Sequence, residues 1–323
     1  MTTSSGVAPR IGIIGTGAIG GFYGVMLAKA GLDVHFLLRS EYAAVKAQGL
    51  HVDSAVYGQL DLQPVQAYQA VEDMPPCDWL LVGAKTSSNA ALASLINQAA
   101  APGARVLLLQ NGLGVEDELR PLLDDSLHLL GGLCFICVHR AAPGKVVHQS
   151  QGMVTLGYHS GPAQQASAQQ AIAEEGAALF RRAGLESAAL ESLPQARWQK
   201  LVWNVPYNGL SVLLNAGTSA LMASQDARAL IRELMREVIA AAAACGHPLP
   251  DAYDERLLKI TDRMPDYLPS MYHDFAEQRP MELQAIYAAP IAAALASGCA
   301  VPRMQMLLQA LAFLQQRNAE RSA

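Results

Sequence analysis

Residues 10–20 read Arg-Ile-Gly-Ile-Ile-Gly-Thr-Gly-Ala-Ile-Gly, and this stretch decides the fold of the first half of the chain. An apolar strand pattern leads into glycines spaced G-x-G-x-x-G, and a helical pattern follows and stops at Gly31. Gly15 permits a tight turn, Gly17 lets a pyrophosphate approach the backbone, and Gly20 lets helix and strand pack closely. A glycine-rich turn that binds nothing is the alternative, but strand, turn and helix together favour a dinucleotide site. We predict that the dinucleotide contacts Gly15, Thr16, Gly17, Ala18, Ile19 and Gly20.

The residues after the second predicted strand select the cofactor, because an acid at this point holds a ribose 2′-hydroxyl and an arginine holds a 2′-phosphate. The chain has Leu37-Leu38-Arg39-Ser40 here. Arg39 can bind a phosphate through two N–H groups and can stack on adenine, while Ser40 adds a hydroxyl donor. NADPH is therefore predicted. The alternative is that Glu41 turns inward to a ribose and Arg39 is a solvated surface residue.

Composition indicates a globular protein of two domains. Of 323 residues, 51% are hydrophobic and 16% are charged, so a large core can form. A formal net charge of −5 weighs against nucleic acid or an anionic membrane as a partner. Apolar runs such as Val238 to Cys245 are shorter than the roughly 20 residues of a membrane span. The start lacks the basic region of a signal peptide, and five cysteines form no disulfide framework, so a reducing cytoplasm is the expected location.

From Arg10 to Glu186, short apolar runs alternate with helical patterns, which predicts an α/β domain with a mostly parallel sheet covered on both faces. Two segments separated by Gly152 are predicted to form the two strands of an antiparallel hairpin at the sheet edge. The helix from Ala166 to Ala183 still belongs to this domain. The predicted strands are Arg10 to Ile14, Val34 to Leu38, Trp79 to Ala84, Arg105 to Gln110 and Leu129 to Phe135, and the hairpin strands are Val146 to His148 and Met153 to Gly157.

Strand patterns almost vanish near Leu190 to Pro194, and the rest of the chain is predicted to be all-α. We therefore place a Rossmann domain at residues 1–191 and a helical substrate-binding or dimerisation domain at residues 192–323. The long apolar faces of the helical domain are compatible with a homodimer. The predicted helices are Gln195 to Asn215, Gln225 to Cys245, Pro250 to Arg263, Arg279 to Ser297, and Arg303 to Arg317.

One face of the first helix of the second domain carries a polar stripe. Lys200, Asn204 and Asn208 recur at i, i+4 and i+8, so they project from the same side. A lysine can protonate a developing alkoxide and asparagines can orient the oxygens of a substrate, which is the chemistry of carbonyl reduction. A solvated helix face is the alternative, although asparagine is a poor choice for plain helix surface. Pro206 removes one backbone donor and predicts a kink beside this face.

Four motifs together resemble the ketopantoate reductase family over nearly the whole chain. They are Gly15-Thr16-Gly17-Ala18-Ile19-Gly20, Gln110-Asn111-Gly112-Leu113-Gly114, the Arg197 to Asn204 segment Arg-Trp-Gln-Lys-Leu-Val-Trp-Asn, and Ser270-Met271-Tyr272-His273-Asp274 with Glu282. The resemblance implies a Rossmann domain followed by a helical domain like the C-terminal domain of 6-phosphogluconate dehydrogenase. It also implies NADPH-dependent reduction of a 2-keto acid, with 2-dehydropantoate as the foremost substrate.

The resemblance further implies roles for single residues. Lys200 matches the proton donor, and Glu282 matches an acid near the nicotinamide and the substrate hydroxyl. Substrate-binding positions match Asn111, Asn204, Asn208 and Ser270. Cofactor-binding positions match the glycine turn, Arg39, Lys85, Asn111 and Glu282.

The chain departs from the family pattern after Glu282. The family usually has an Asp two residues after the acid and then an Asn-Gly pair, whereas this chain has Gln284 and Tyr287-Ala288. One alternative is therefore a reductase of a different 2-keto or 3-hydroxy acid. The other is a catalytically silent NADPH sensor. No metal site is expected from Cys134 and Cys137, because no second C-x-x-C accompanies them, and no hydrolase is expected from Ser270, His273 and Asp274, because no nucleophile elbow is present.

Overall fold

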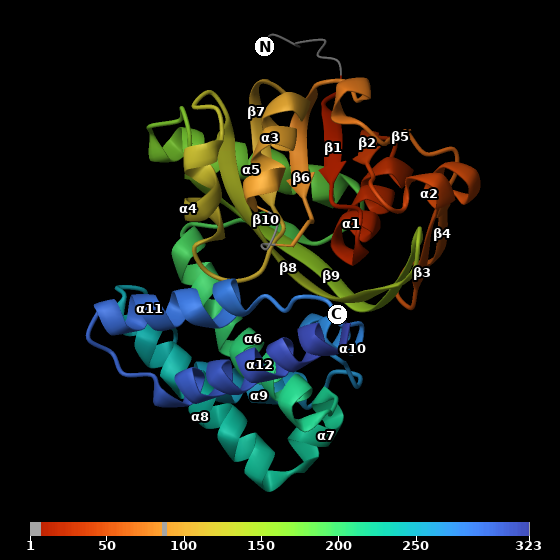
Figure 1. The fold of residues 1–323 in the computed structure, drawn as a ribbon. Helices are drawn as coiled ribbons and strands as arrows, with labels where there is room; N and C mark the ends of the chain where they lie inside the picture. Colours follow the sequence, from red (N-terminus) through yellow and green to blue (C-terminus); the bar gives the residue numbers. More distant parts are fainter. Residues whose placement is uncertain (1–7, 86–88, 323) are drawn as a thin grey trace. The chain divides into compact units, whose positions relative to one another are not determined.

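The computed structural model describes residues 8–85 and 89–322, and these residues divide into two compact units (Figure 1). The first unit runs to Gln110 and continues with Glu116–Leu193. The second consists of Asn111–Val115 and Pro194–Ala323, so a short piece of the N-terminal half groups with the helices. The predicted functional division after residue 191 stays a prediction. None of the helices in the described ranges is long and apolar enough for a membrane span.

The first unit is built on one ten-stranded sheet with the order β4-β3-β9-β8-β7-β6-β1-β2-β5, and β10 pairs with β9. Its central strands β8, β7, β6, β1 and β2 pair in parallel, while β8 and β9 are antiparallel. The strands are β1 (Arg10–Ile14), β2 (Asp33–Leu37), β3 (Leu50–Ser54), β4 (Gly58–Leu62), β5 (Ala67–Tyr68), β6 (Cys77–Val82), β7 (Ala100–Leu108), β8 (His128–Ala142), β9 (Lys145–Ser160) and β10 (Ser187–Ala189). The predicted α/β class is confirmed.

Helices cover both faces of this sheet. One apolar cluster joins Ile11, Ile13 and Trp79 to side chains of α1 and α5, and Tyr23 of α1 meets Phe180 of α5 edge-on at 5.5 Å. Residues that alternate with these along the strands point to the other face, where α3 packs on β6 and β7. The helices of this unit are α1 (Ala18–Lys29), α2 (Tyr42–Gln48), α3 (Asn89–Ala99), α4 (Val115–Leu119) and α5 (Ala166–Arg182).

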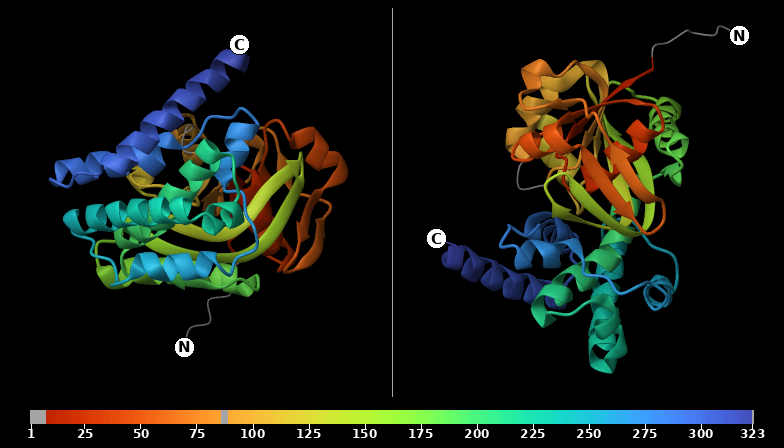
Figure 2. Two further views of the ribbon diagram at one scale, coloured as in Figure 1. Left: turned by 90° about the horizontal axis from the view of Figure 1, so that it is seen from below. Right: turned by 90° about the vertical axis from the view of Figure 1, so that its right-hand side faces the viewer.

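The predicted hairpin around Gly152 is wrong. Both of its supposed strands belong to the single long strand β9, whose partner is β8, and the two form the long curved pair visible in Figure 2. The turn lies instead at Pro143-Gly144, between Ala142 and Lys145. Gln151 and Gly152 have φ values of 68° and 130°, and the register shifts beside them. Gly152 therefore marks a β-bulge, which bends a strand without ending it.

The second unit is all-α, as predicted, and its helices are α6 (Leu193–Leu214), α7 (Thr218–Ala223), α8 (Gln225–Ala244), α9 (Tyr253–Thr261), α10 (Ser270–Ala276), the π-helix η4 (Gln284–Ala288), α11 (Ala289–Ala296) and α12 (Pro302–Ser322). The short helices α7 and α10 were not predicted. The helix predicted from Arg279 begins too early, because Pro280 disfavours helical backbone at Arg279 and the Met281 N–H is donated to the side chain of Gln315 (2.8 Å).

A buried carboxylate holds the start of α12. Glu237 of α8 accepts the backbone N–H groups of Arg303 (3.0 Å) and Met304 (3.0 Å), which have no partner inside their own helix. Replacing Glu237 with alanine is expected to lower the free energy of unfolding by about 1–3 kcal/mol. Urea denaturation measures this. Glu233→Ala on the same helix is the control, because its exposed ion pairs with Arg236 and Arg303 each contribute at most about 1 kcal/mol. Equal losses in the two variants would contradict a capping role for Glu237.

Candidate functional site

The glycine turn after β1 has the geometry that an anion site needs. Gly15 has φ 88°, and a side chain there would meet the Ala84 backbone N at 2.3 Å. A side chain at Gly20 would meet the Gly15 carbonyl oxygen at 2.3 Å, whereas the space beside Gly17 is open. The Thr16 hydroxyl is buried and has no hydrogen-bond partner in residues 8–85 and 89–322. Close packing below the turn, open space above it and an unpaired hydroxyl fit a bound pyrophosphate.

Two other predicted cofactor residues follow the strands beside β1. Arg39 comes just after β2 and Lys85 just after β6, and both strands pair with β1 in parallel. The carboxyl ends of these strands therefore meet at one edge of the sheet, and the chain reverses its strand order there, which is where open α/β sheets bind ligands. The structure thus brings Arg39, Lys85 and the glycine turn to the same edge of the first unit.

Glu41 is engaged elsewhere in this unit. It is buried, one carboxylate oxygen is ion-paired with Arg140 of β8, and the other accepts the Gly144 N–H (3.0 Å). The carboxylate therefore holds the β8–β9 turn, and the alternative in which it holds a ribose receives no support. Arg39 is exposed, and its side chain forms no ion pair within the described ranges. It remains available for an anion at the sheet edge.

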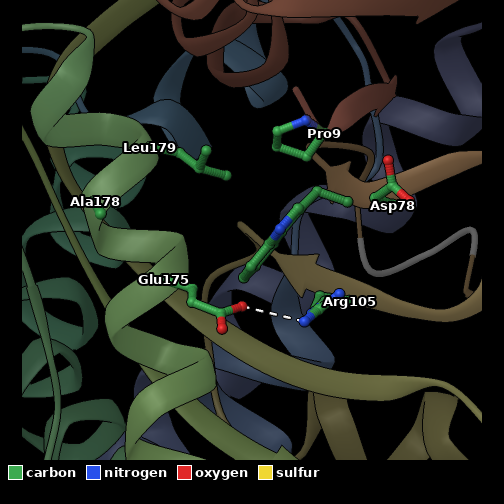
Figure 3. A pocket seen from close by; sticks show the side chains of 7 residues that line it. Pro9, Asp78, Arg105, Glu175, Ala178 and Leu179 are labelled. Carbon is green, nitrogen blue, oxygen red and sulfur yellow. Dashed lines mark hydrogen bonds and ion pairs between the residues drawn. The ribbon is translucent and has the colours of Figure 1, made fainter. Parts of the chain in front are cut away.

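A surface pocket lies at the opposite edge of the same sheet (Figure 3). Pro9 and Asp78 line it at the starts of β1 and β6, and Glu175 lines it from α5. Arg105 and Glu175 form an ion pair in it, with Nη2 3.1 Å from Oε2, and Asp78 accepts the backbone N–H of Arg10 (2.8 Å). This pocket contains none of the predicted site residues.

The polar stripe of α6 lies in the second unit. Asn204 and Asn208 are 6% and 3% exposed, and Lys200 is half-buried. A solvated helix face is therefore wrong for the two asparagines. Asn208 Oδ1 is buried without a hydrogen-bond partner among the described residues. Such an acceptor costs about 1–3 kcal/mol unless a ligand or water donates to it, which makes this face a candidate binding surface.

The loop that carries Asn111 groups with the second unit rather than with the sheet that precedes it. The Leu113 N–H donates to the Ala285 carbonyl of η4 (2.8 Å). Gly112 has φ 100°, and a side chain there would lie 2.5 Å from the Ala285 backbone. A larger residue would separate the loop from η4, so the loop is placed by close backbone contact.

The remaining predicted residues, Ser270 and Glu282, both precede η4 in the chain. Ser270 is the first residue of α10 and is half-buried. Glu282 is half-buried just before η4, and its carbonyl accepts the Ile286 N–H (3.2 Å). The second unit thus contains Asn111, Lys200, Asn204, Asn208, Ser270 and Glu282.

Gly209 and the contact of Tyr287 with α6 were not predicted from the sequence. A side chain at Gly209 would meet the Tyr287 hydroxyl at 2.5 Å, so α6 and η4 pack at this glycine. An isolated glycine inside a helical pattern, directly after Asn208, was the signal that could have indicated this close approach.

Cys134 and Cys137 are buried in β8. Across residues 8–85 and 89–322, no group of three His, Cys, Asp or Glu side chains is arranged to hold a metal ion.

Comparisons with known proteins agree with the resemblance drawn from the motifs. The family model described as ketopantoate reductase PanE/ApbA matches residues 11–161, and that for its C terminal matches residues 192–315. A 2-dehydropantoate 2-reductase of Nostoc sp. is 42% identical over 96% of both chains. A crystal structure of 2-dehydropantoate 2-reductase from Geobacter metallireducens superposes with a TM-score of 0.87 at 41% identity, covering 94% of this chain and 98% of that one. One from Methylococcus capsulatus has a TM-score of 0.81 at 34% identity, covering 96% and 97%. The chain therefore belongs to the ketopantoate reductase family of dinucleotide-dependent oxidoreductases.

Proposed function

We propose that this protein reduces a 2-keto acid with NADPH, and that the substrate is 2-dehydropantoate, which becomes (R)-pantoate for pantothenate and coenzyme A synthesis. The observation that carries the proposal is the α6 face on which a half-buried lysine accompanies two buried asparagines, one of them with an unpaired acceptor. The 2-dehydropantoate 2-reductases that this chain resembles over almost its full length support the choice of substrate.

The first unit would hold the cofactor. The open space at Gly17, the unpaired Thr16 hydroxyl and the amides that start α1 suit the pyrophosphate. Arg39 would hold the 2′-phosphate, because its guanidinium can donate two parallel hydrogen bonds. Lys85, at the same sheet edge, adds a positive charge. When bound, the reduced nicotinamide supplies a hydride to the keto carbon.

The second unit would hold the substrate and supply the proton. Lys200 donates the proton that the keto oxygen gains as the carbon is reduced, which leaves a 2-hydroxy acid and a neutral lysine. Asn204 and Asn208 orient the substrate through their side-chain amides, whose N–H groups can donate to its oxygens. Asn208 Oδ1, which has no partner among the described residues, can accept a hydrogen bond from a substrate hydroxyl. Ser270 binds the carboxylate, Glu282 contacts the substrate hydroxyl, and Asn111 contacts both substrate and cofactor.

The test is NADPH oxidation by the purified protein, followed by absorbance, with 2-dehydropantoate and a panel of other 2-keto acids, each repeated with NADH. Fast turnover that is selective for 2-dehydropantoate and NADPH is the expected result. If the enzyme prefers another keto acid, that acid replaces 2-dehydropantoate as the assigned substrate. The departures from the family pattern at Gln284 and Tyr287 favour this alternative. Tight NADPH binding without turnover of any substrate would indicate a catalytically silent NADPH sensor.

The proposal also places the protein in the cytoplasm and includes a homodimer.

A further inference from the structure

The π-helix η4 begins two residues after Glu282 and touches two other segments that carry proposed substrate residues. The Ala285 carbonyl accepts the Leu113 N–H of the Asn111 loop (2.8 Å). From the same π-helix, the Tyr287 hydroxyl donates to the Val205 carbonyl of α6 (2.8 Å). A single turn of π-helix is thus bonded to the Asn111 loop and to α6. π-Helical turns are rare and often occur at functional sites.

The Tyr287 hydroxyl is bonded to the backbone of α6 between Asn204 and Asn208. It donates to the Val205 carbonyl (2.8 Å). The same hydroxyl packs against Gly209, where a side chain would lie 2.5 Å from it. The hydroxyl therefore holds the backbone of the Asn204–Asn208 turn. Pro206, within this turn, supplies no N–H donor of its own.

Tyr287 and Gly209 are closely packed against each other. Tyr287 is 0% exposed, and burial raises its pKa far above the usual range, so the hydroxyl stays protonated and can donate. A side chain at Gly209 would lie 2.5 Å from this hydroxyl and 2.7 Å from Leu307 Cδ2. The hydrogen-bond partner of the hydroxyl is a backbone carbonyl, so the contact positions the helix itself.

We infer that Tyr287 is a positioning residue, whose hydroxyl sets the place of the Asn204–Asn208 turn of α6 relative to Glu282 and the Asn111 loop. It acts through backbone atoms and does not contact the substrate. This inference rests on the proposed function, because it concerns the same site. The inference also gives a structural role to Tyr287, one of the positions where the chain departs from the family pattern.

The test compares two single-atom deletions on buried tyrosines of the same unit. Tyr287→Phe removes the hydroxyl that donates to α6. Tyr207→Phe is the matched control, because Tyr207 is equally buried and its hydroxyl donates to Met222 Sδ (3.0 Å) instead of to the backbone of α6. With Tyr287→Phe, kcat/KM for the keto acid is expected to fall about 10- to 100-fold, since small displacements of substrate-orienting groups have effects of this size. In Tyr287→Phe the dissociation constant for NADPH is expected to change far less than kcat/KM, because the residues proposed to bind its phosphates lie in the other unit. Tyr207→Phe keeps the wild-type dissociation constant and kcat/KM.

A third variant approaches the same contact from the other side. Gly209→Ala places a methyl group 2.5 Å from the Tyr287 hydroxyl, which must shift, and it is expected to reproduce the kinetic pattern of Tyr287→Phe. Wild-type kcat/KM in Tyr287→Phe, or an equal loss in Tyr207→Phe, would overturn the inference.

Amide hydrogen exchange separates this inference from the proposed function. In Tyr287→Phe, the amides from Val205 to Gly209 and that of Leu113 are expected to exchange faster, while in Tyr207→Phe the Leu113 amide keeps its wild-type rate. Unchanged exchange in Tyr287→Phe overturns the inference whether or not the enzyme is active. If the wild-type protein reduces no keto acid, the proposed function fails and the exchange data alone decide the role of Tyr287.

Discussion

Lys200→Ala is expected to lower kcat for the keto acid by about 10²- to 10⁴-fold, which is the usual contribution of a positioned general acid. Without the lysine, the oxygen that gains negative charge must take its proton from water. Binding of NADPH is expected to be unchanged, because the residues proposed to bind its phosphates lie in the other unit. Stopped-flow measurement of NADPH oxidation gives the rate of the reduction step, and fluorescence titration gives the affinity for NADPH.

The matched control is Lys259→Ala, which removes an exposed lysine from the last turn of α9 in the same unit. It changes the net charge by the same amount and is expected to keep wild-type kcat. If Lys200→Ala also keeps near wild-type turnover, the assignment of Lys200 as proton donor is wrong, and the donor must be sought elsewhere in the site.

Arg39→Ala is expected to raise the KM for NADPH about 10- to 100-fold and to leave the kcat/KM for NADH unchanged. Hydrogen bonds to a charged group contribute roughly 1.5–3 kcal/mol, and the 2′-phosphate that Arg39 would bind is absent from NADH. Steady-state kinetics with each cofactor at saturating keto acid measure both effects. The preference of the enzyme for NADPH should therefore decrease or disappear.

Arg182→Ala provides the control for Arg39, since it removes another exposed arginine of the first unit, in the last turn of α5. It is expected to change neither KM. Cofactor kinetics in Arg39→Ala that match the wild type would mean that Arg39 does not bind the 2′-phosphate. Glu41 would not then be the ribose-binding residue, because both of its carboxylate oxygens are already bonded within the unit.

Local sequence patterns predicted most of the central fold. The strand before Gly15, the helix after it and the long helices α5, α6, α8 and α12 agree with the structure within a few residues. These elements have strong periodicity and end at glycine, proline or polar residues, so their own sequence defines them. The missed strands β3, β4, β5 and β10 are short or lie toward the sheet edges, and pairing with distant strands decides whether they form.

The course of β9 shows why pattern alone misplaced the hairpin. A glycine between two apolar segments fits a turn and a bulge equally well from the sequence. Pairing with β8 favours the bulge, because β8 is 15 residues long and pairs with β9 on both sides of Gly152. The bulge relieves the local mismatch, and the strand continues.

Local sequence patterns were enough to predict the glycine turn, the α/β domain followed by helices, and the shared face of Lys200, Asn204 and Asn208, because spacing along a strand or helix fixes which side a residue faces. Only the packed structure shows that the Asn111 loop joins the helical unit, that Glu41 is bonded to Arg140, and that Tyr287 is hydrogen-bonded to the backbone of α6. Each of these contacts joins residues about 80 to 170 positions apart, and such contacts form only when the packed core brings the segments together.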